Sequence, residues 1–152
     1  MIDRILHLLT GTTGEAVAEH PDALQVAVAA LLVEAARMDD HFDESERAVI
    51  LRVLSQRFAL SPEATARLLA AALKADDQST QLFRFTHLAV QSLNPPERVR
   101  IIEMLWEVAY ADGVLDPEED ALLRRIAGLI YVSDMDRGAA RLRVLHRLGI
   151  AE

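Results

Sequence analysis

Residues 38–46 read Met-Asp-Asp-His-Phe-Asp-Glu-Ser-Glu, and residues 111–119 read Ala-Asp-Gly-Val-Leu-Asp-Pro-Glu-Glu. The acids of the two stretches recur at one constant separation of 73 residues, as three pairs: Asp39 with Asp112, Asp43 with Asp116, and Glu46 with Glu119. The same separation relates identical residues outside the two stretches, among them Leu32 and Leu105, Arg52 and Arg125, and Leu69 and Leu142. These pairs predict two copies of one unit, each built around an acidic turn.

Apolar residues recur three and four positions apart along nearly the whole chain, a spacing typical of helices, and the alternation expected of strands is missing. Three helix starts are marked by a capping side chain before a proline, at Ser61-Pro62, Asn94-Pro95 and Asp116-Pro117. We therefore predict helices at residues 2–9, 22–38, 43–57, 62–76, 80–92, 95–111, 116–131 and 135–147.

The predicted fold is all-α, a compact bundle of seven to eight helices made of two pseudo-symmetric three-helix repeats. Repeat 1 covers about residues 22–77, repeat 2 covers about residues 95–148, and a linking helix at about 80–92 has no counterpart. The linkers are short, so residues 1–152 should pack as a single domain. Trp106 lies in one of the two most apolar helices, and we expect it to anchor the core.

Composition excludes several classes of function. The net charge of −8 opposes nonspecific binding to nucleic acid, which requires a positive surface. The chain has no cysteine, so disulfides, thiolate zinc sites and cysteine nucleophiles are excluded. We expect no membrane span, because the most apolar stretch is interrupted by polar residues and is too short. No secretory leader is recognisable at the N-terminus, and a cytoplasmic location is expected.

One interpretation of the acidic turns is structural. Gly113 follows the helix predicted at 95–111, and glycine at this position supplies the left-handed conformation that closes a helix. Asp116 is expected to cap the next helix through a main-chain amide of its first turn. Leu115, just before that cap, can pack onto the same turn. On this interpretation the repeated acids mainly build a tight corner between two helices.

The other interpretation is a divalent-cation site. A complete EF-hand loop is excluded, because its first and third positions would be Val108 and Tyr110. Two units packed face to face would instead pool the acids of both turns around calcium, magnesium or manganese, with His41 as a further donor. Capping does not explain Asp39 and Asp112, which lie near helix C-termini where negative charge is unfavourable. The six candidate metal ligands are Asp39, Asp43, Glu46, Asp112, Asp116 and Glu119.

The stretch Ala109-Tyr-Ala-Asp-Gly-Val-Leu-Asp-Pro-Glu-Glu119 resembles the TerB-like family of tellurite-resistance proteins, a family related to the N-terminal region of the DjlA co-chaperone. The earlier copy keeps the acids but has Asp40 where the family pattern has glycine. The resemblance covers about residues 22–147. It implies an all-helical stress-response protein whose acidic residues, at the six positions above, have been suggested to bind metal.

No catalytic motif is recognisable, and we expect the protein not to be an enzyme. The expected function is that of a TerB-like stress-response or scaffold protein acting through a protein partner or as a homo-oligomer. The alternative is a cation-binding module that uses the paired acidic turns. The last predicted helix carries a basic strip that we expect to be solvated, although a clamp on an acidic turn or a docking strip would also use it: Arg137, Arg141, Arg143, His146 and Arg147.

Overall fold

The computed structural model describes residues 22–37, 44–76, 81–111 and 113–151. Within these ranges the chain forms seven α-helices and no strand, which confirms the predicted all-α class. The helix predicted at 2–9 lies outside the described residues. The helices are α3 (Ala23–Ala36), α4 (Glu44–Phe58), α5 (Pro62–Asp76), α6 (Gln81–Ser92), α7 (Pro95–Ala109), α8 (Pro117–Leu129) and α9 (Asp134–Leu148).

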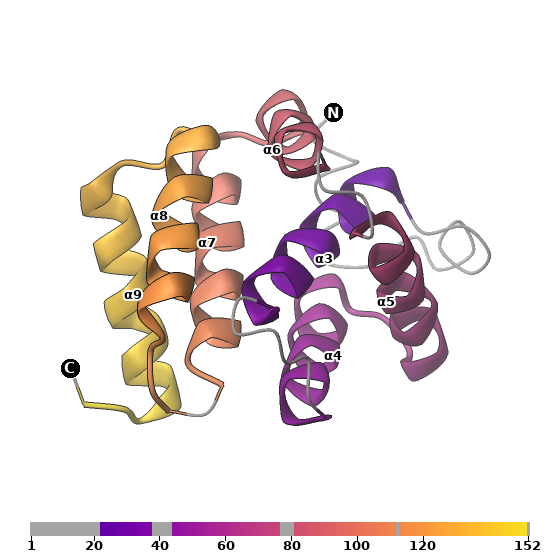
Figure 1. The fold of residues 1–152 in the computed structure, drawn as a ribbon, viewed down its shortest axis with the longest axis horizontal. Helices are drawn as coiled ribbons and strands as arrows, with labels where there is room; N and C mark the ends of the chain where they lie inside the picture. The colour runs from indigo at the N-terminus through magenta and orange to yellow at the C-terminus, as the bar shows by residue number, and fades with distance from the viewer. Residues whose placement is uncertain (1–21, 38–43, 77–80, 112, 152) are drawn as a thin grey trace.

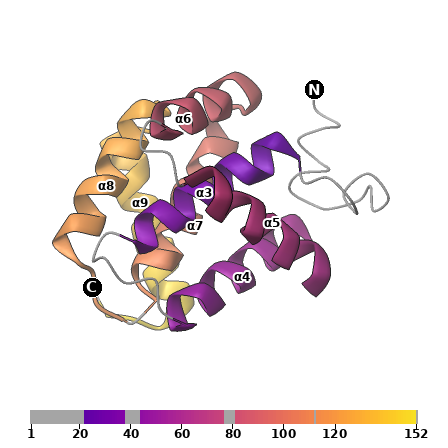
Figure 2. The same cartoon turned by 45° about the vertical axis from the view of Figure 1, so that its right-hand side comes forward.

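The helices pack into one compact bundle with α3 at its centre (Figures 1 and 2). Helix α3 contacts every other helix except α9 extensively, and its largest interfaces are with α5 and α6. Helices α7, α8 and α9 lie side by side on one flank, and α4 and α5 form the other. Helix α6 lies across the end of the bundle that is opposite the start of α8 (Figures 1 and 2).

The core is built largely from α3, which carries a single charged residue, and from the buried C-terminal part of α7. Eleven of the fourteen residues of α3 are buried, and residues 101–109 of α7 are all buried. A helix that is apolar on most of its circumference is stable in water only when neighbours cover it on several sides. Trp106 is 1% exposed and is among the largest fully buried side chains, so the prediction that it anchors the core is confirmed.

The predicted capping residues begin their helices. The Ser61 side chain accepts a hydrogen bond from the Ala64 amide at 3.1 Å at the start of α5. Asn94 accepts one from the Glu97 amide at 3.0 Å, and the Glu97 carboxylate accepts one in return from the Asn94 amide at 2.8 Å. These bonds satisfy main-chain donors that the first turn of a helix leaves free.

Helices α4 and α8 end in the same way, and neither uses glycine. Ala59 (φ 52°) follows α4 and Tyr131 (φ 60°) follows α8, both in the left-handed region that disfavours side chains. The next amide then bonds back into the helix, from Leu60 to the Ser55 carbonyl at 3.1 Å and from Val132 to the Ala127 carbonyl at 2.8 Å. This Schellman geometry turns the chain sharply toward the following helix.

The helix bounds agree with the predicted duplication. Adding 73 to the starts of α3, α4 and α5 gives 96, 117 and 135, and the helices α7, α8 and α9 begin at 95, 117 and 134. Superposition of the two three-helix halves stays a prediction. In the part of the chain that the structure describes, no helix combines the length and the apolar character that a bilayer crossing requires.

Candidate functional site

The corner between α7 and α8 has the geometry predicted for it. Gly113 has a φ of +84°, so the left-handed position after α7 is filled by the residue that tolerates it best. The Asp116 carboxylate accepts a hydrogen bond from the Glu118 amide at 2.8 Å and caps α8. Leu115 is partly buried and packs against the core. The structural interpretation of this turn is therefore confirmed for Gly113 and Asp116, and the packing of Leu115 onto the first turn of α8 stays a prediction.

The start of α4 lies against this corner. A pocket of about 280 Å³ is lined by Glu46 of the first acidic turn together with Asp116 and Glu119 of the second. The other lining residues are Ser45, Val108, Ala109, Ala111, Val114, Leu115 and Pro117. The tertiary structure thus brings acids from both copies to one place, although they are 70 and 73 residues apart in the chain. The other candidates, Asp39, Asp43 and Asp112, lie outside the described residues.

The described carboxylates do not by themselves form a cation site. Among the residues that the structure describes, no group of three or more histidine, aspartate or glutamate side chains is arranged to hold a metal ion. One oxygen of Asp116 already accepts a main-chain hydrogen bond, and Glu46 and Glu119 have interactions of their own. A complete set of oxygen ligands at this pocket would need donors beyond these three. The predicted six-residue metal site stays a prediction.

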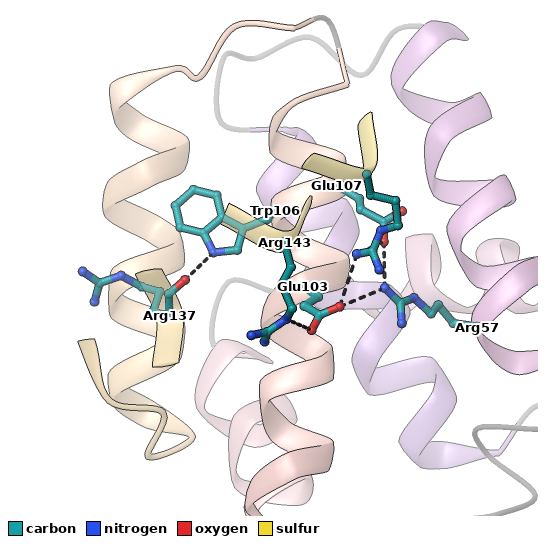
Figure 3. A network of polar contacts seen from close by, with 7 residues as sticks. Arg57, Glu103, Trp106, Glu107, Arg137 and Arg143 are labelled. Atoms are coloured by element: carbon teal, nitrogen blue, oxygen red, sulfur yellow. Dashed lines mark hydrogen bonds and ion pairs between the residues drawn. The ribbon is translucent and has the colours of Figure 1, made fainter. Parts of the chain in front are cut away.

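A second polar cluster joins α7 to α4 and α9, and sequence reasoning did not foresee it (Figure 3). Glu103 and Glu107 are buried one turn apart on α7, and three arginines from two other helices surround them. Arg57 of α4 donates to Glu103 at 3.3 Å and to Glu107 at 2.8 Å. From α9, Arg147 donates to the same two carboxylates at 3.2 and 3.3 Å, and Arg143 donates to Glu103 at 3.0 Å.

The arginines determine the charge state of Glu103. Burial by itself raises the pKa of this carboxyl, but hydrogen bonds from Arg143 and Arg147 and the charges of Arg143 and Arg57 lower it further than burial raises it. The net result is a pKa below the ordinary value. Glu103 is therefore held ionised, as the counter-ion of arginines that belong to α4 and α9.

The expectation that the basic strip on α9 is solvated holds only in part: the Arg143 and Arg147 side chains are 50% and 47% exposed, but both also form ion pairs within the chain. Arg143 and Arg147 bind side chains of α7, as the alternative of an intramolecular contact predicted. Their partners are buried glutamates, however, and not the residues of an acidic turn. Arg141 donates to the Tyr110 hydroxyl at 2.7 Å, and Arg137 pairs with Asp134 at 2.6 Å. The Arg137 carbonyl also accepts a hydrogen bond from the Trp106 indole at 3.1 Å (Figure 3).

The family model described as tellurite resistance protein TerB matches residues 25–142. This range runs from the first turn of α3 into α9, so it includes the acidic corner, the pocket and most of the buried cluster. The chain belongs to the TerB family. A search of curated proteins and a search of solved structures each found no match.

The TerB match agrees with the resemblance drawn from the acidic turns.

The glutamate–arginine cluster also leaves a recognisable pattern in the sequence. Glu103 and Glu107 are the two acids in an otherwise apolar segment, Ile101–Tyr110, and their spacing of four places both on one face of the helix. Two acids on one face of a buried helix require cationic partners. Sequence spacing does not reveal which arginines those are.

Proposed function

We propose that this protein is a non-enzymatic member of the TerB family that serves tellurite resistance or a related stress response by binding protein partners. The observation that carries the proposal is the family match, which spans residues 25–142 and so includes nearly all of the described bundle. A match of this extent links the tellurite-resistance association to the folded domain as a whole. It is not limited to one turn.

The charge state of the buried cluster supports a non-catalytic role. A carboxyl that acts as general acid near neutral pH needs a raised pKa, whereas the pKa of Glu103 is lowered by the arginines around it. Arg57, Arg143 and Arg147 all direct side-chain nitrogens at α7, so the cluster joins helices. We therefore assign Glu103 and Glu107 to folding and not to chemistry.

Partner binding is supported by the exposed apolar surface. Five large apolar side chains among the described residues are exposed: Phe83, Val114, Tyr131, Met135 and Leu142. Exposed apolar groups that gather on one face of a folded protein commonly mark interaction sites. Phe83 and Tyr131 line one pocket together.

The proposal is tested by tellurite challenge of a bacterial host that lacks this gene. A plasmid copy of the full chain should restore growth on potassium tellurite. A second plasmid, carrying Trp106→Asp to disrupt the core, should not. Equal growth of the deleted strain and the complemented strain over a range of tellurite concentrations would refute the stress-response role.

The second candidate function is divalent-cation binding at the acidic pocket. It is favoured by one observation, the presence of Glu46 beside Asp116 and Glu119 in a single pocket of about 280 Å³. With carboxylates from Asp39, Asp43 and Asp112 added, the ligand set would consist entirely of oxygen, which suits calcium, magnesium or manganese. Bound metal would then link the two acidic turns.

Calorimetric titration with each of the three cations separates capping from ligation. Asp116→Asn removes the charge but keeps a good capping residue, so it should abolish cation binding with little effect on stability. Asp116→Ala removes both properties and should also lower the free energy of unfolding by about 1 kcal/mol. No heat of binding at millimolar concentrations of any of the three cations would eliminate this candidate.

A further inference from the structure

A pocket of about 420 Å³ opens between α6 and the C-terminal end of α8. Its lining includes Phe83, Arg84, His87, Val90, Leu129 and Tyr131. Phe83 is 59% exposed and Tyr131 is 76% exposed, so two of the large apolar side chains that the described surface leaves uncovered are found at this one pocket. The pocket is lined by residues at the C-terminal end of α8, whereas the acidic corner is at the start of the same helix.

The backbone at Tyr131 is strained, and the strain is not offset by burial. Its φ of 60° places a bulky residue in the left-handed region where glycine is the favoured choice. An exposed tyrosine gains little by packing within the chain. The same left-handed helix ending occurs at Ala59, so the conformation belongs to the turn, and what distinguishes Tyr131 is a large aromatic side chain that stays exposed there. The side chain of Tyr131 is therefore a candidate for binding something outside the fold.

The charge around the pocket is opposite to that of the chain as a whole. The chain carries 24 acidic and 16 basic residues, yet neither residues 81–92 nor residues 121–133 contain an aspartate or glutamate. Arg84 and His87 line the pocket. The guanidinium carbon of Arg125 lies 5.7 Å from the centroid of the Phe83 ring, within the range of a cation–π contact.

The acids nearest in sequence to this part of α8 are engaged elsewhere. Asp120 pairs with Arg124 at 3.5 Å, and Asp134 pairs with Arg137 at 2.6 Å. No residue that lines the pocket is acidic, Arg84 is a lining residue, and Arg125 lies over the ring of the lining residue Phe83. The combination is an aromatic, basic recess on an acidic protein.

We propose that this recess binds an acidic segment of a partner protein. A large apolar side chain of the segment would pack between Phe83 and Tyr131, and its carboxylates would face Arg84 and Arg125. The proposal rests on the partner-binding function proposed above and specifies the chemistry of the partner. A nucleic acid is disfavoured because the net charge of −8 repels a polyanion as a whole. A second copy is disfavoured because joining this recess to another copy's acidic corner is a heterologous contact, which gives a ring or a filament, whereas most homo-oligomers are two-fold dimers with the same surface on both subunits.

The test is selection of peptides from a phage-displayed random library on the purified full chain. Enriched peptides should combine aspartate or glutamate with a large apolar residue. Their affinity, measured by fluorescence polarisation of the synthetic peptides, should fall at least tenfold in Tyr131→Gly and in Arg84→Glu. Because glycine relieves the left-handed strain, Tyr131→Gly should raise the melting temperature by about 2–4 °C, so loss of binding there is separable from loss of fold.

Ala59→Gly is the matched control, since it relieves the same strain at the end of α4, away from the recess. It should raise the melting temperature similarly and leave peptide affinity unchanged. The proposal is overturned by failure to enrich peptides, by enriched peptides without acids, or by unchanged affinity in Tyr131→Gly. It is also overturned if single-stranded oligonucleotides bind the recess, or if sedimentation shows self-association that Tyr131→Gly abolishes.

The tellurite assay distinguishes this proposal from the one on which it rests. If the chain restores growth on tellurite but enriches no peptide, the proposed stress-response function stands and the acidic-segment proposal is refuted. Conversely, if the chain enriches acidic peptides at the recess but does not restore growth, the binding site stands and the stress-response role is refuted.

Discussion

Arg57 Nη2 lies 2.8 Å from Glu107 Oε1, and this contact joins α4 of the first predicted repeat to α7 of the second. The same nitrogen lies 3.3 Å from Glu103, so one guanidinium bridges two buried carboxylates that are one helical turn apart (Figure 3). The Arg57 side chain is 25% exposed, which limits the screening of the pair by water. The contact therefore adds a polar link to the helix packing through which the two halves of the bundle meet.

Replacing Arg57 by methionine should lower the free energy of unfolding by about 2 kcal/mol, because it removes charge-assisted hydrogen bonds to two buried carboxylates. Urea denaturation followed by circular dichroism measures the change. The matched control is Arg124→Met, which breaks the ion pair with Asp120. The Arg124 side chain is 64% exposed, so loss of this pair should change the free energy of unfolding by less than about 0.5 kcal/mol. Equal effects of the two variants would show that burial does not strengthen the Arg57 contacts.

Glu103→Gln should make the free energy of unfolding less dependent on pH between pH 7 and pH 3. The pKa of Glu103 is lower in the folded chain than its ordinary value of 4.5, so the ionised group stabilises the fold above that value. This contribution is lost as the pH falls through the lowered pKa of the folded state. The wild type should be more stable than Glu103→Gln by about 2 kcal/mol at pH 7. The difference should shrink below about pH 4.5 in urea denaturation measured from pH 7 to pH 3. A difference that is the same at both ends of this range would contradict the assignment.

Gly138→Ala and Gly149→Ala should change stability in opposite directions. Gly138 is inside α9 and a β-carbon there would have no heavy atom within 4 Å, so alanine should stabilise by about 0.5–1 kcal/mol. Gly149 ends α9 with a φ of 72°, where a β-carbon is strained although the space is open, and alanine should destabilise by about 1 kcal/mol. Thermal unfolding of the two variants checks the signs. Stabilisation by Gly149→Ala would mean that α9 does not end in this conformation.

Trp106→Phe should lower the free energy of unfolding by about 2 kcal/mol, because it removes the 3.1 Å hydrogen bond to the Arg137 carbonyl and leaves space in the core. Trp106 is the one tryptophan of the chain, so its fluorescence reports on the interface of α7 and α9. Native wild-type protein should emit at a short wavelength that shifts to the red on unfolding. Emission at the wavelength of solvated indole in the native state would contradict the burial of Trp106.

Most helix bounds were predictable because the signals that begin and end helices are local. The predicted helix at 62–76 has the observed bounds, the one at 80–92 begins one residue too early, and the one at 135–147 is one residue short at each end. The ends of α7 and α8 were placed two residues too late, at 111 and 131. Turn geometry decides these ends: α8 stops where Tyr131 adopts a left-handed conformation, which residue propensities do not predict for tyrosine.

The candidate sites were predictable in part. The repeated acids pointed to the corner, and the proximity of Glu46 to Asp116 and Glu119 follows the suggestion that the two turns meet. The role of the α9 arginines was not predictable, because Arg143 and Arg147 are 40 to 44 residues from the glutamates that they bind. The same holds for the recess at Phe83 and Tyr131, which lies between helices that are not consecutive in the chain.

The order and type of the helices, their caps and the duplicated acidic turns were already specified in the chain of amino acids, because each depends on contacts among residues a few positions apart. Folding alone decided which charges became buried partners and which aromatic groups stayed uncovered. Arg57 meets Glu107 only after α4 and α7 pack together, and Tyr131 stays exposed only because α6 and α8 pack without covering it. Such contacts depend on the relative positions of whole helices, and local sequence patterns do not encode them.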